Sequence, residues 1–271
     1  MLTTLFLYSA YIVDIQNSKF TYAFLGRIFF YFYMTYAILM AGGVGNRVGA
    51  GIPKQFVEVF GKPVIAYTMQ KLQQCSDIDY IELVCVDGFQ DRLQKIADDN
   101  GITKVLKIVT GGKDYEYSII HGVEGLKGIA KDDDVILIHW AASPFVSDEI
   151  LKDNIRVCKE KGNAMSACFA FLLYGTNDGD HAEGIIDRAT FKTLSAPQSF
   201  LYKEIVEFYR QVEEKRLFDY IEAHTTSLMA ELKIPIYFSK GDQTNIKITT
   251  PEDLELFKGY VLAQRYNQTH G

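Results

Sequence analysis

Residues 37–56 read AILMAGGVGNRVGAGIPKQF, and the rest of the chain is interpreted outward from them. The first four residues, 37–40, are apolar and form a run short enough for a buried strand. Five glycines occupy the next eleven positions, and glycine lets the backbone come close to a ligand. A strand that ends in such a loop presents backbone N–H groups to phosphate oxygens. Two cations, Arg47 and Lys54, lie within and just after the loop, so the stretch predicts a phosphate-binding site.

The glycine spacing matches neither of the two common phosphate-binding loops. A Gly-Lys-Ser/Thr ending is absent, and Gly43, Gly45 and Gly49 follow G-x-G-x-x-x-G, which is not the dinucleotide fingerprint. Spacing alone therefore leaves an ordinary glycine-rich turn open. The cations at fixed offsets and the Pro-Lys-Gln triplet at 53–55 favour phosphate binding.

Five short motifs carry a resemblance to a known enzyme family. They lie at 41–47 together with 53–55, and at 111–118, 138–146, 196–200 and 245–249. In this order they resemble the cytidylyltransferases that act on polyol phosphates, namely the 2-C-methyl-D-erythritol 4-phosphate and the ribitol-5-phosphate cytidylyltransferases. The resemblance covers the chain from about Thr35 to the C-terminus.

The resemblance implies a cytoplasmic enzyme that transfers CMP from CTP to a sugar-alcohol phosphate and releases pyrophosphate, with Mg²⁺ as its divalent metal. The product would serve isoprenoid biosynthesis or the biosynthesis of a surface polymer such as teichoic acid or capsule. The protein has little covalent work in such a reaction. It aligns the two reactants and spreads the negative charge of the transition state.

The resemblance also assigns roles to individual residues. Arg47, Lys54 and Lys247 match catalytic cations around the phosphates. The nucleotide-binding positions are Ala41, Gly42, Gly43, Gly45, Arg47, Lys54, Gly111, Gly112, Ser118 and Ala141. The substrate-binding positions are Thr176, Thr225 and Lys247. Gln198 lies in a proline turn that we interpret as structural support. From the residues alone, an alternative stays open for each of these side chains. Arg47 and Lys54 could be solvated surface cations, Lys247 a salt-bridged lysine of a strand, and Ser118 a serine at the end of a helix.

The chain departs from the family pattern where a metal and the acceptor phosphate would bind. The family motif His-Asp-Ala-Ala-Arg-Pro stands at 139–144 as His-Trp-Ala-Ala-Ser-Pro, so Trp140 replaces the aspartate that helps to hold magnesium. Tyr115 stands where the family has an arginine. The metal ligand is therefore unknown, with His139, Asp242 and the phosphates themselves as candidates. The ring of Trp140 either stacks on a base or sugar or packs beneath the pocket.

Two functional hypotheses follow. The first is an active cytidylyltransferase with an altered acceptor. The second is a catalytically impaired nucleotide-binding relative that acts as a regulatory or partner subunit. A membrane-anchored structural protein is a third class, and it rests only on residues 1–34.

The bulk composition of the 271 residues is that of a globular protein, with 48% hydrophobic and 23% charged residues. The formal net charge of −6 argues against nucleic acid as a partner. Any polyphosphate must then bind in a local basic pocket. The four cysteines form no C-x-x-C pair, which favours free thiols in a reducing compartment over a zinc site. Apolar neighbours predict that Cys75, Cys85 and Cys168 are buried.

Residues 1–34 differ from the rest, being rich in aromatic residues and poor in charge. The apolar part at 20–40 is long enough for a membrane span, but Arg27 interrupts it. A basic start and a small-residue cleavage site, which a signal peptide needs, are not clear. We therefore interpret 1–34 as an upstream extension, with Met34 as the natural start, and 35–271 as the cytidylyltransferase-like domain. A membrane-anchoring segment is the alternative.

Strands and helices alternate through the domain, which predicts an α/β fold: a Rossmann-like, mostly parallel sheet with helices on both faces. Expected strands lie at 80–86, 105–109, 135–139, 164–171, 234–238 and 245–249, and expected helices at 63–74, 89–100, 117–126, 147–161 and 251–267. Ligands of such sheets bind at the carboxyl ends of the strands, near a switch point. The glycine loop and residues 139–144 both follow strands there.

Residues 174–194 interrupt the alternation with turn-forming residues. In the resembled family this region is a protruding arm that pairs with a second subunit, so the resemblance implies a homodimer. An ordinary surface hairpin is the alternative from the residues alone.

Overall fold

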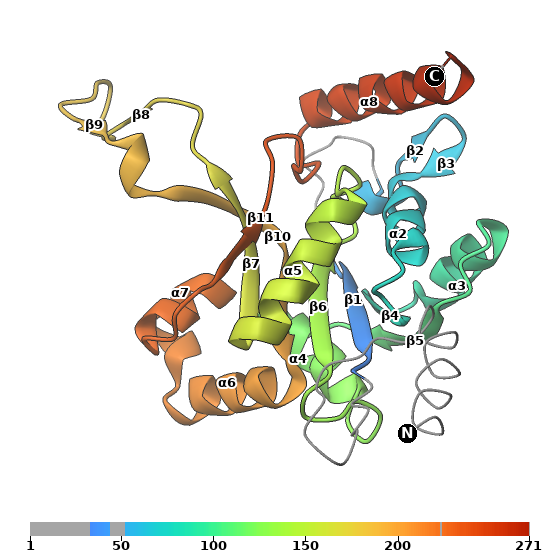
Figure 1. The fold of residues 1–271 in the computed structure, drawn as a ribbon, viewed down its shortest axis with the longest axis horizontal. Helices are drawn as coiled ribbons and strands as arrows, with labels where there is room; N and C mark the ends of the chain where they lie inside the picture. Colours follow the sequence, from blue (N-terminus) through green and yellow to red (C-terminus); the bar gives the residue numbers. More distant parts are fainter. Residues whose placement is uncertain (1–32, 44–51, 223, 271) are drawn as a thin grey trace, which may run out of the picture. The chain divides into compact units, whose positions relative to one another are not determined.

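The computed structural model describes residues 33–43, 52–222 and 224–270 (Figure 1). The predictions for the N-terminal extension, for Gly45 and for Arg47 lie outside the described residues. Thr35–Gly271 form one compact unit. Among the described residues, none of the helices combines the length and the apolarity that crossing a membrane requires.

The core of the unit is a seven-stranded sheet with the order β11-β7-β10-β6-β1-β4-β5. Strand β1 (Thr35–Ala41) pairs in parallel with β4 (Tyr80–Cys85) on one side and with β6 (Val135–Trp140) on the other. All seven residues of β1 are buried. An interior strand covered on both faces needs apolar residues at successive positions, which explains the unbroken apolar run that follows Thr35.

The outer strands make the sheet mixed but mostly parallel, as predicted. At one edge, β5 (Val105–Thr110) runs parallel to β4, and at the other β11 (Phe238–Lys240) runs parallel to β7 (Asn163–Phe169). Strand β10 (Lys192–Leu201) runs antiparallel between β6 and β7.

The sequence prediction fails at the antiparallel strand and in the C-terminal segment. The expected proline turn at 196–200 is part of β10, where Pro197 lies at a shift in register that lets the strand continue. The strand expected at 234–238 is wrong except for its last residue, because the strand formed there, β11, begins only at Phe238. The strand expected at 245–249 is absent. The segment is instead held by separate hydrogen bonds, from the Asn245 side chain to Ala196 O and from the Ile248 N–H to Ala142 O, which do not form a ladder with a neighbouring strand.

Helices cover both faces of the sheet. On one face, α2 (Val64–Gln74), α3 (Gln90–Asp99) and α5 (Asp148–Lys161) share a core with Leu39 of β1. On the other face, α4 (Tyr115–Gly125) packs so closely that a Cβ on Gly122 would lie 2.9 Å from Ile38 Cγ2. Helix α6 (Tyr202–Glu214) packs beside α4. The shorter elements are α7 (Thr225–Glu231), β2 (Glu58–Val59), β3 (Lys62–Pro63), η2 (Lys54–Phe56), η3 (Arg188–Thr190) and η4 (Leu217–Asp219).

Two predicted helix starts are confirmed by their caps. The Ser147 side chain accepts from the N–H of Ile150 at the start of α5. The final helix, α8 (Pro251–His270), begins after Thr250, whose Oγ1 accepts from the N–H of Asp253 while the Asp253 carboxylate accepts from the N–H of Thr250. Helix α8 extends three residues beyond the predicted end at 267.

The region predicted as an arm forms the hairpin of β8 (Tyr174–Gly175) and β9 (Ile185–Ile186), which extends away from the seven-stranded sheet (Figure 1). Large apolar side chains are exposed on and beside it, including Leu172 at 71%, Leu173 at 74% and Ile185 at 72%. Cys168 lies near this end of β7, which explains why it is only half-buried, whereas Cys75 and Cys85 are buried as predicted.

Candidate active site

A pocket of about 450 Å³ opens at the carboxyl ends of β1, β5 and β6. The chain continues from β1 to β4 on one side and later returns to β6 on the other, so β1 and β6 flank a topological switch point. The lining residues are Met40, Gly42, Gly43, Lys54, Gln55, Gly112, Lys113, Asp114, Tyr115, Ser118, Trp140, Ala141, Ala142, His224 and Lys247.

The start of the glycine loop is held in place by the side chain of Gln55. This buried amide donates from Nε2 to Ala41 O at 2.8 Å and to Gly43 O at 2.9 Å. Gln55 belongs to the short helix η2, and so does Lys54. The same turn that presents the lysine ammonium group to the pocket therefore also fixes the backbone after β1.

The loop after β5 is tied to the first turn of α4. The N–H of Gly112 donates to Ser118 Oγ at 3.0 Å, and the Ser118 hydroxyl donates to Asp114 O at 2.6 Å. A Cβ on Gly112 would lie 2.4 Å from the Cβ of Tyr117, so this position requires glycine. The Asp114 side chain caps α4 by accepting from the N–H of Tyr117 at 2.9 Å.

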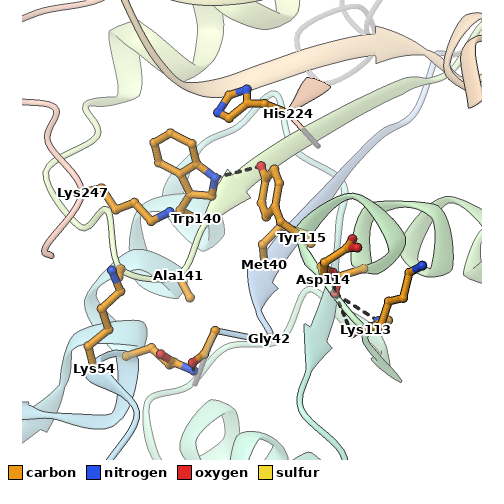
Figure 2. Close-up of a pocket in the computed structure, with 15 residues that line it drawn as sticks. Met40, Gly42, Lys54, Lys113, Asp114, Tyr115, Trp140, Ala141, His224 and Lys247 are labelled. Atoms are coloured by element: carbon orange, nitrogen blue, oxygen red, sulfur yellow. Dashed lines mark hydrogen bonds between the residues drawn. The ribbon is translucent and has the colours of Figure 1, made fainter. Parts of the chain in front are cut away.

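The pocket is positively charged although the chain is acidic. Lys54, Lys113 and Lys247 line it together with one carboxylate, Asp114. Figure 2 shows that the side chains of Lys54 and Lys247 reach the part of the pocket beside Ala141 from two different segments. The Lys113 ammonium group lies 4.1 Å from the ring centroid of Tyr117. The pocket therefore offers the local basic surroundings that a polyphosphate would need on this acidic chain.

Aromatic rings form the other end of the pocket. The Nε1–H of Trp140 donates to the Tyr115 hydroxyl at 2.8 Å, and the Lys247 Nζ lies 4.3 Å from the Trp140 ring centroid (Figure 2). The His224 ring lies 6.4 Å from the Tyr115 ring, centroid to centroid. Burial raises the pKa of Tyr115 well above its usual value, so its hydroxyl stays a neutral phenol.

Residues 35–263 match the family model described as IspD, 2-C-methyl-D-erythritol 4-phosphate cytidylyltransferase. The chain belongs to this cytidylyltransferase family.

Two relatives show the range within the family. The ribitol-5-phosphate cytidylyltransferase of Lacticaseibacillus paracasei is 34% identical over 229 residues, which cover 84% of this chain and 98% of the relative. The 2-C-methyl-D-erythritol 4-phosphate cytidylyltransferase of Clostridium perfringens is 32% identical over 229 residues, which cover 83% of this chain and 97% of the relative. Family membership therefore gives a cytidylyltransferase without naming its acceptor.

A solved structure confirms the fold of this family. The 4-diphosphocytidyl-2C-methyl-D-erythritol synthase of Anaerococcus prevotii superposes with a TM-score of 0.70 at 24% identity, over 85% of this chain and 99% of that one. The predicted resemblance and the predicted α/β class are both confirmed.

Most of the described residues that the cytidylyltransferase resemblance singles out come together. Gly42, Gly43, Lys54, Gly112, Ser118, Ala141 and Lys247 line the pocket. Ala41 and Gly111 lie directly behind the lining: the carbonyl of Ala41 accepts from Gln55, and the N–H of Gly111 donates to Cys85 O at 2.7 Å.

Two predicted substrate-binding residues lie elsewhere. Thr225 is fully buried, where its hydroxyl donates to Glu116 at 3.0 Å and accepts from the Gln198 amide at 3.1 Å. Its place in this buried network does not support a direct contact with substrate in the pocket, and it supports the structural role predicted for Gln198. Thr176 is exposed on the arm, where its Oγ1 accepts from the N–H of Gly184 at 3.0 Å, and it does not line the pocket.

Neither candidate metal ligand lines the pocket of this cytidylyltransferase-family chain. His139 is buried beneath it, with Nε2 2.9 Å from Ser143 O, and burial lowers its pKa to about 4. Asp242 Oδ1 accepts from the N–H groups of Thr244 and Asn245. Within the described ranges, no group of three or more His, Cys, Asp or Glu side chains is placed to hold a metal ion.

The donor set of the pocket does not fit a magnesium ion held by the protein. Mg²⁺ prefers several oxygen ligands in octahedral geometry. Among the described residues that line the pocket, Asp114 carries the single carboxylate, and one of its oxygens already caps α4. We therefore assign no step of the reaction to a metal bound by the described side chains.

Several lining residues have no site role in the sequence interpretation. Lys113 and Asp114 lie inside the motif at 111–118, so that motif already contained the signal. Gln55 belongs to the Pro-Lys-Gln triplet at 53–55, but only the folded structure shows that its side chain contacts the start of the glycine loop. His224 lies in the segment before α7, and local spacing does not show that this segment reaches the pocket.

Proposed function

We propose that this member of the family transfers CMP from CTP to a sugar-alcohol phosphate of the ribitol phosphate or methylerythritol phosphate type, and releases pyrophosphate. The observation that carries the proposal is the pocket itself, where Gly42 and Gly43, whose backbone is held by Gln55, line the same cavity as Lys54 and Lys247. Backbone N–H groups and ammonium groups together are suited to a triphosphate.

The proposed step is an in-line displacement at phosphorus. An oxygen of the acceptor phosphate attacks the α-phosphorus of CTP, a new P–O bond forms, and the bond to the bridging oxygen of the β-phosphate breaks. Pyrophosphate leaves with the electron pair of that bond. The chain supplies no covalent intermediate, so alignment and charge stabilisation have to provide the rate enhancement.

Each part of the pocket has a proposed role in this step. The loop residues from Ala41 to Gly45 and the pair Gly111 and Gly112, with Ser118 and Ala141, would hold the nucleotide. Lys54, Lys247 and Arg47 would neutralise the charge that develops on the phosphates. Thr176 stays a proposed acceptor contact through the arm. Mg²⁺ stays a proposed requirement, with oxygens of the triphosphate as its ligands.

We also propose that the protein is a cytoplasmic homodimer formed through the arm. The exposed apolar side chains at 171–173 and 185–186 support this, because soluble monomers rarely expose large contiguous apolar patches. Removal of the hairpin should then yield a monomer in a sedimentation experiment.

The second candidate is a nucleotide-binding relative without turnover that acts as a regulatory or partner subunit. The described part of the pocket lining holds no set of carboxylates, which favours this candidate. A pyrophosphate-release assay with CTP, Mg²⁺ and both acceptors distinguishes the two. Release that depends on one acceptor supports the enzyme. Binding of CTP by calorimetry without release for any acceptor supports the partner subunit.

A further inference from the structure

The side chain of Lys247 rests on the indole of Trp140. Its ammonium nitrogen lies 4.3 Å from the ring centroid, a distance at which a cation is attracted to the negative face of the ring. The backbone of the same segment is docked beside this contact, because the N–H of Ile248 donates to Ala142 O at 2.8 Å. Lys247 is therefore held to the end of β6 both through its side chain and through its neighbour.

The indole is in turn fixed by a second residue. The Nε1–H of Trp140 donates to the hydroxyl of Tyr115 at 2.8 Å. Tyr115 is the first residue of α4, which is anchored by the Asp114 cap. The plane of the ring is thus set from α4, while its face carries a lysine that comes from the segment before α8.

The contact has an electrostatic consequence that a carboxylate at the same place would not have. An indole attracts an ammonium group through its quadrupole, and it adds no negative charge to the pocket. The aspartate of the family pattern would add a full negative charge beside the phosphates. With Trp140, the lysine is ordered while the pocket keeps its positive potential.

Ordering matters for this side chain because a lysine has four rotatable bonds and loses considerable rotamer freedom when it is fixed. An ammonium group that already rests on a ring has lost part of this freedom before the nucleotide arrives. The stabilisation that it gives to a developing negative charge is then available without reorganisation.

We infer that Trp140 and Tyr115 are positioning residues, which hold the Lys247 ammonium group in the pocket at the place where the family pattern has a carboxylate. The inference rests on the proposed function for its effect on turnover, whereas the lysine–indole contact itself can be measured without any reaction. It adds a role that neither interpretation of Trp140 made from the sequence included, because one face of the ring carries a lysine of the same chain.

The contact is tested by NMR on the full chain carrying isotope-labelled lysine. Protons of Lys247 that lie over the ring face should be shifted upfield, and Lys247→Arg identifies their signal. We expect the upfield shift to be lost in Trp140→Leu and kept in Trp140→Phe, which retains a ring face. Adding inorganic pyrophosphate should move the Lys247 signal in the wild type.

The effect on turnover is tested with the same variants. In Trp140→Leu we expect kcat to fall by about 5-fold to 30-fold, the range that a cation–π contact of this kind corresponds to. The KM for CTP should change little, because the indole does not itself hold the nucleotide. Trp140→Phe should recover most of kcat, and Tyr115→Phe, which removes the acceptor of the indole N–H, should lie between the two.

Phe60→Leu is the matched control. Phe60 also carries a cation on its ring, with Arg265 Cζ 4.9 Å from the centroid, but it does not line the pocket. This variant should leave kcat and the Lys247 signal unchanged. Thermal unfolding of each variant shows whether it is folded. If Trp140→Leu does not fold, the kcat of Tyr115→Phe tests the inference in its place.

The possible results separate this inference from the proposed function. An unshifted Lys247 signal in the wild type, or equal kcat losses in Trp140→Phe and Trp140→Leu, overturns the inference. A shifted signal that responds to pyrophosphate, in a protein that transfers CMP to neither acceptor, supports the positioning role and overturns the enzymatic proposal.

Discussion

The two ends of the pocket are built in different ways. At the nucleotide end, Gly42, Gly43 and Gly112 line the cavity, and hydrogen bonds from Gln55 and to Ser118 hold the backbone there. At the aromatic end, the lining consists of side chains that contact each other, namely Trp140, Tyr115 and His224. The first end depends on backbone geometry and the second on which side chains happen to be present.

This difference explains what the family relation can and cannot transfer. A backbone cradle is preserved wherever the glycines and their braces are preserved, so nucleotide binding is the property that the family signature describes best. The aromatic end can change by single substitutions without disturbing the sheet. We therefore expect the acceptor, and the way in which charge is neutralised there, to be the features that distinguish this chain from its relatives.

The largest effect should come from the cation at the nucleotide end. Replacement of Lys54 by Ala removes an ammonium group from the proposed phosphate site, and loss of one such group commonly lowers kcat by about 10²-fold to 10³-fold. The measurement is pyrophosphate release. Lys95→Ala is the control, because Lys95 is exposed and pairs with Asp99 outside the pocket. Wild-type turnover in Lys54→Ala would contradict the assignment.

A change to the backbone cradle should have the next largest effect. In Gly112→Ala the new Cβ would lie 2.4 Å from Tyr117 Cβ, so the loop or α4 has to move. We expect a loss of about 1–3 kcal/mol in the free energy of CTP binding, by analogy with overpacked cores. Calorimetry measures it. Gly259→Ala is the control, since Gly259 lies in α8 with open space at the Cβ position. An unchanged CTP affinity would mean that the cradle adapts freely.

The free energy of unfolding should depend on pH through Glu82, a buried carboxyl group on β4 that does not line the pocket. Glu82 is fully buried with Lys107 Nζ 4.0 Å from Oε1, and burial raises its pKa from 4.5 to about 8. Between these values the folded protein keeps a proton that the unfolded chain releases, so the free energy of unfolding falls as the pH rises. The slope should approach about 1.4 kcal/mol per pH unit.

Glu82→Gln has no such proton and should lose this slope in urea unfolding experiments between pH 5 and pH 8. CTP affinity at neutral pH should be the same in both proteins. If instead Glu82→Gln weakens CTP binding, the two ends of the pocket are not independent of the core beneath them.

The smallest effect should come from the exposed histidine at the aromatic end. His224→Ala removes a ring that lies 6.4 Å from the Tyr115 ring. We expect the KM for the acceptor to rise by about 3-fold to 10-fold, the size of one modest polar contact, with no change in the KM for CTP. His121→Ala is the control, because His121 is exposed on α4 and does not line the pocket. A larger effect on CTP than on the acceptor would reverse the proposed division of the pocket.

The sequence predicts strand β1 and two helix starts well because their signals are local. An unbroken apolar run specifies an interior strand, and Ser147 and Thr250 mark helix starts through contacts within four residues. The antiparallel strand β10 was missed because Pro197 is usually a strand breaker, and only the neighbouring strands β6 and β7 make its place in the sheet evident.

The aromatic end could not be predicted, because its contacts join residues far apart in the chain. Trp140 meets Tyr115 across 25 positions and Lys247 across more than 100, and no spacing rule connects them. Thr225 is an opposite case, in which the sequence predicts a site contact that the fold does not show. Its position in the family pattern suggested a substrate contact, but the fold places its hydroxyl against the buried carboxylate of Glu116.

The position of β10 has a consequence for how the chain is completed on the ribosome. Strand β10 lies between β6 and β7, although both are synthesised before it. Strands β1, β4, β5 and β6 can pair as soon as they emerge, whereas β7 has no neighbour that links it to them until residue 201 is available. We expect a half-assembled sheet to exist during translation, in which β6 is an open edge that the finished sheet does not have, and such edges are where aggregation begins.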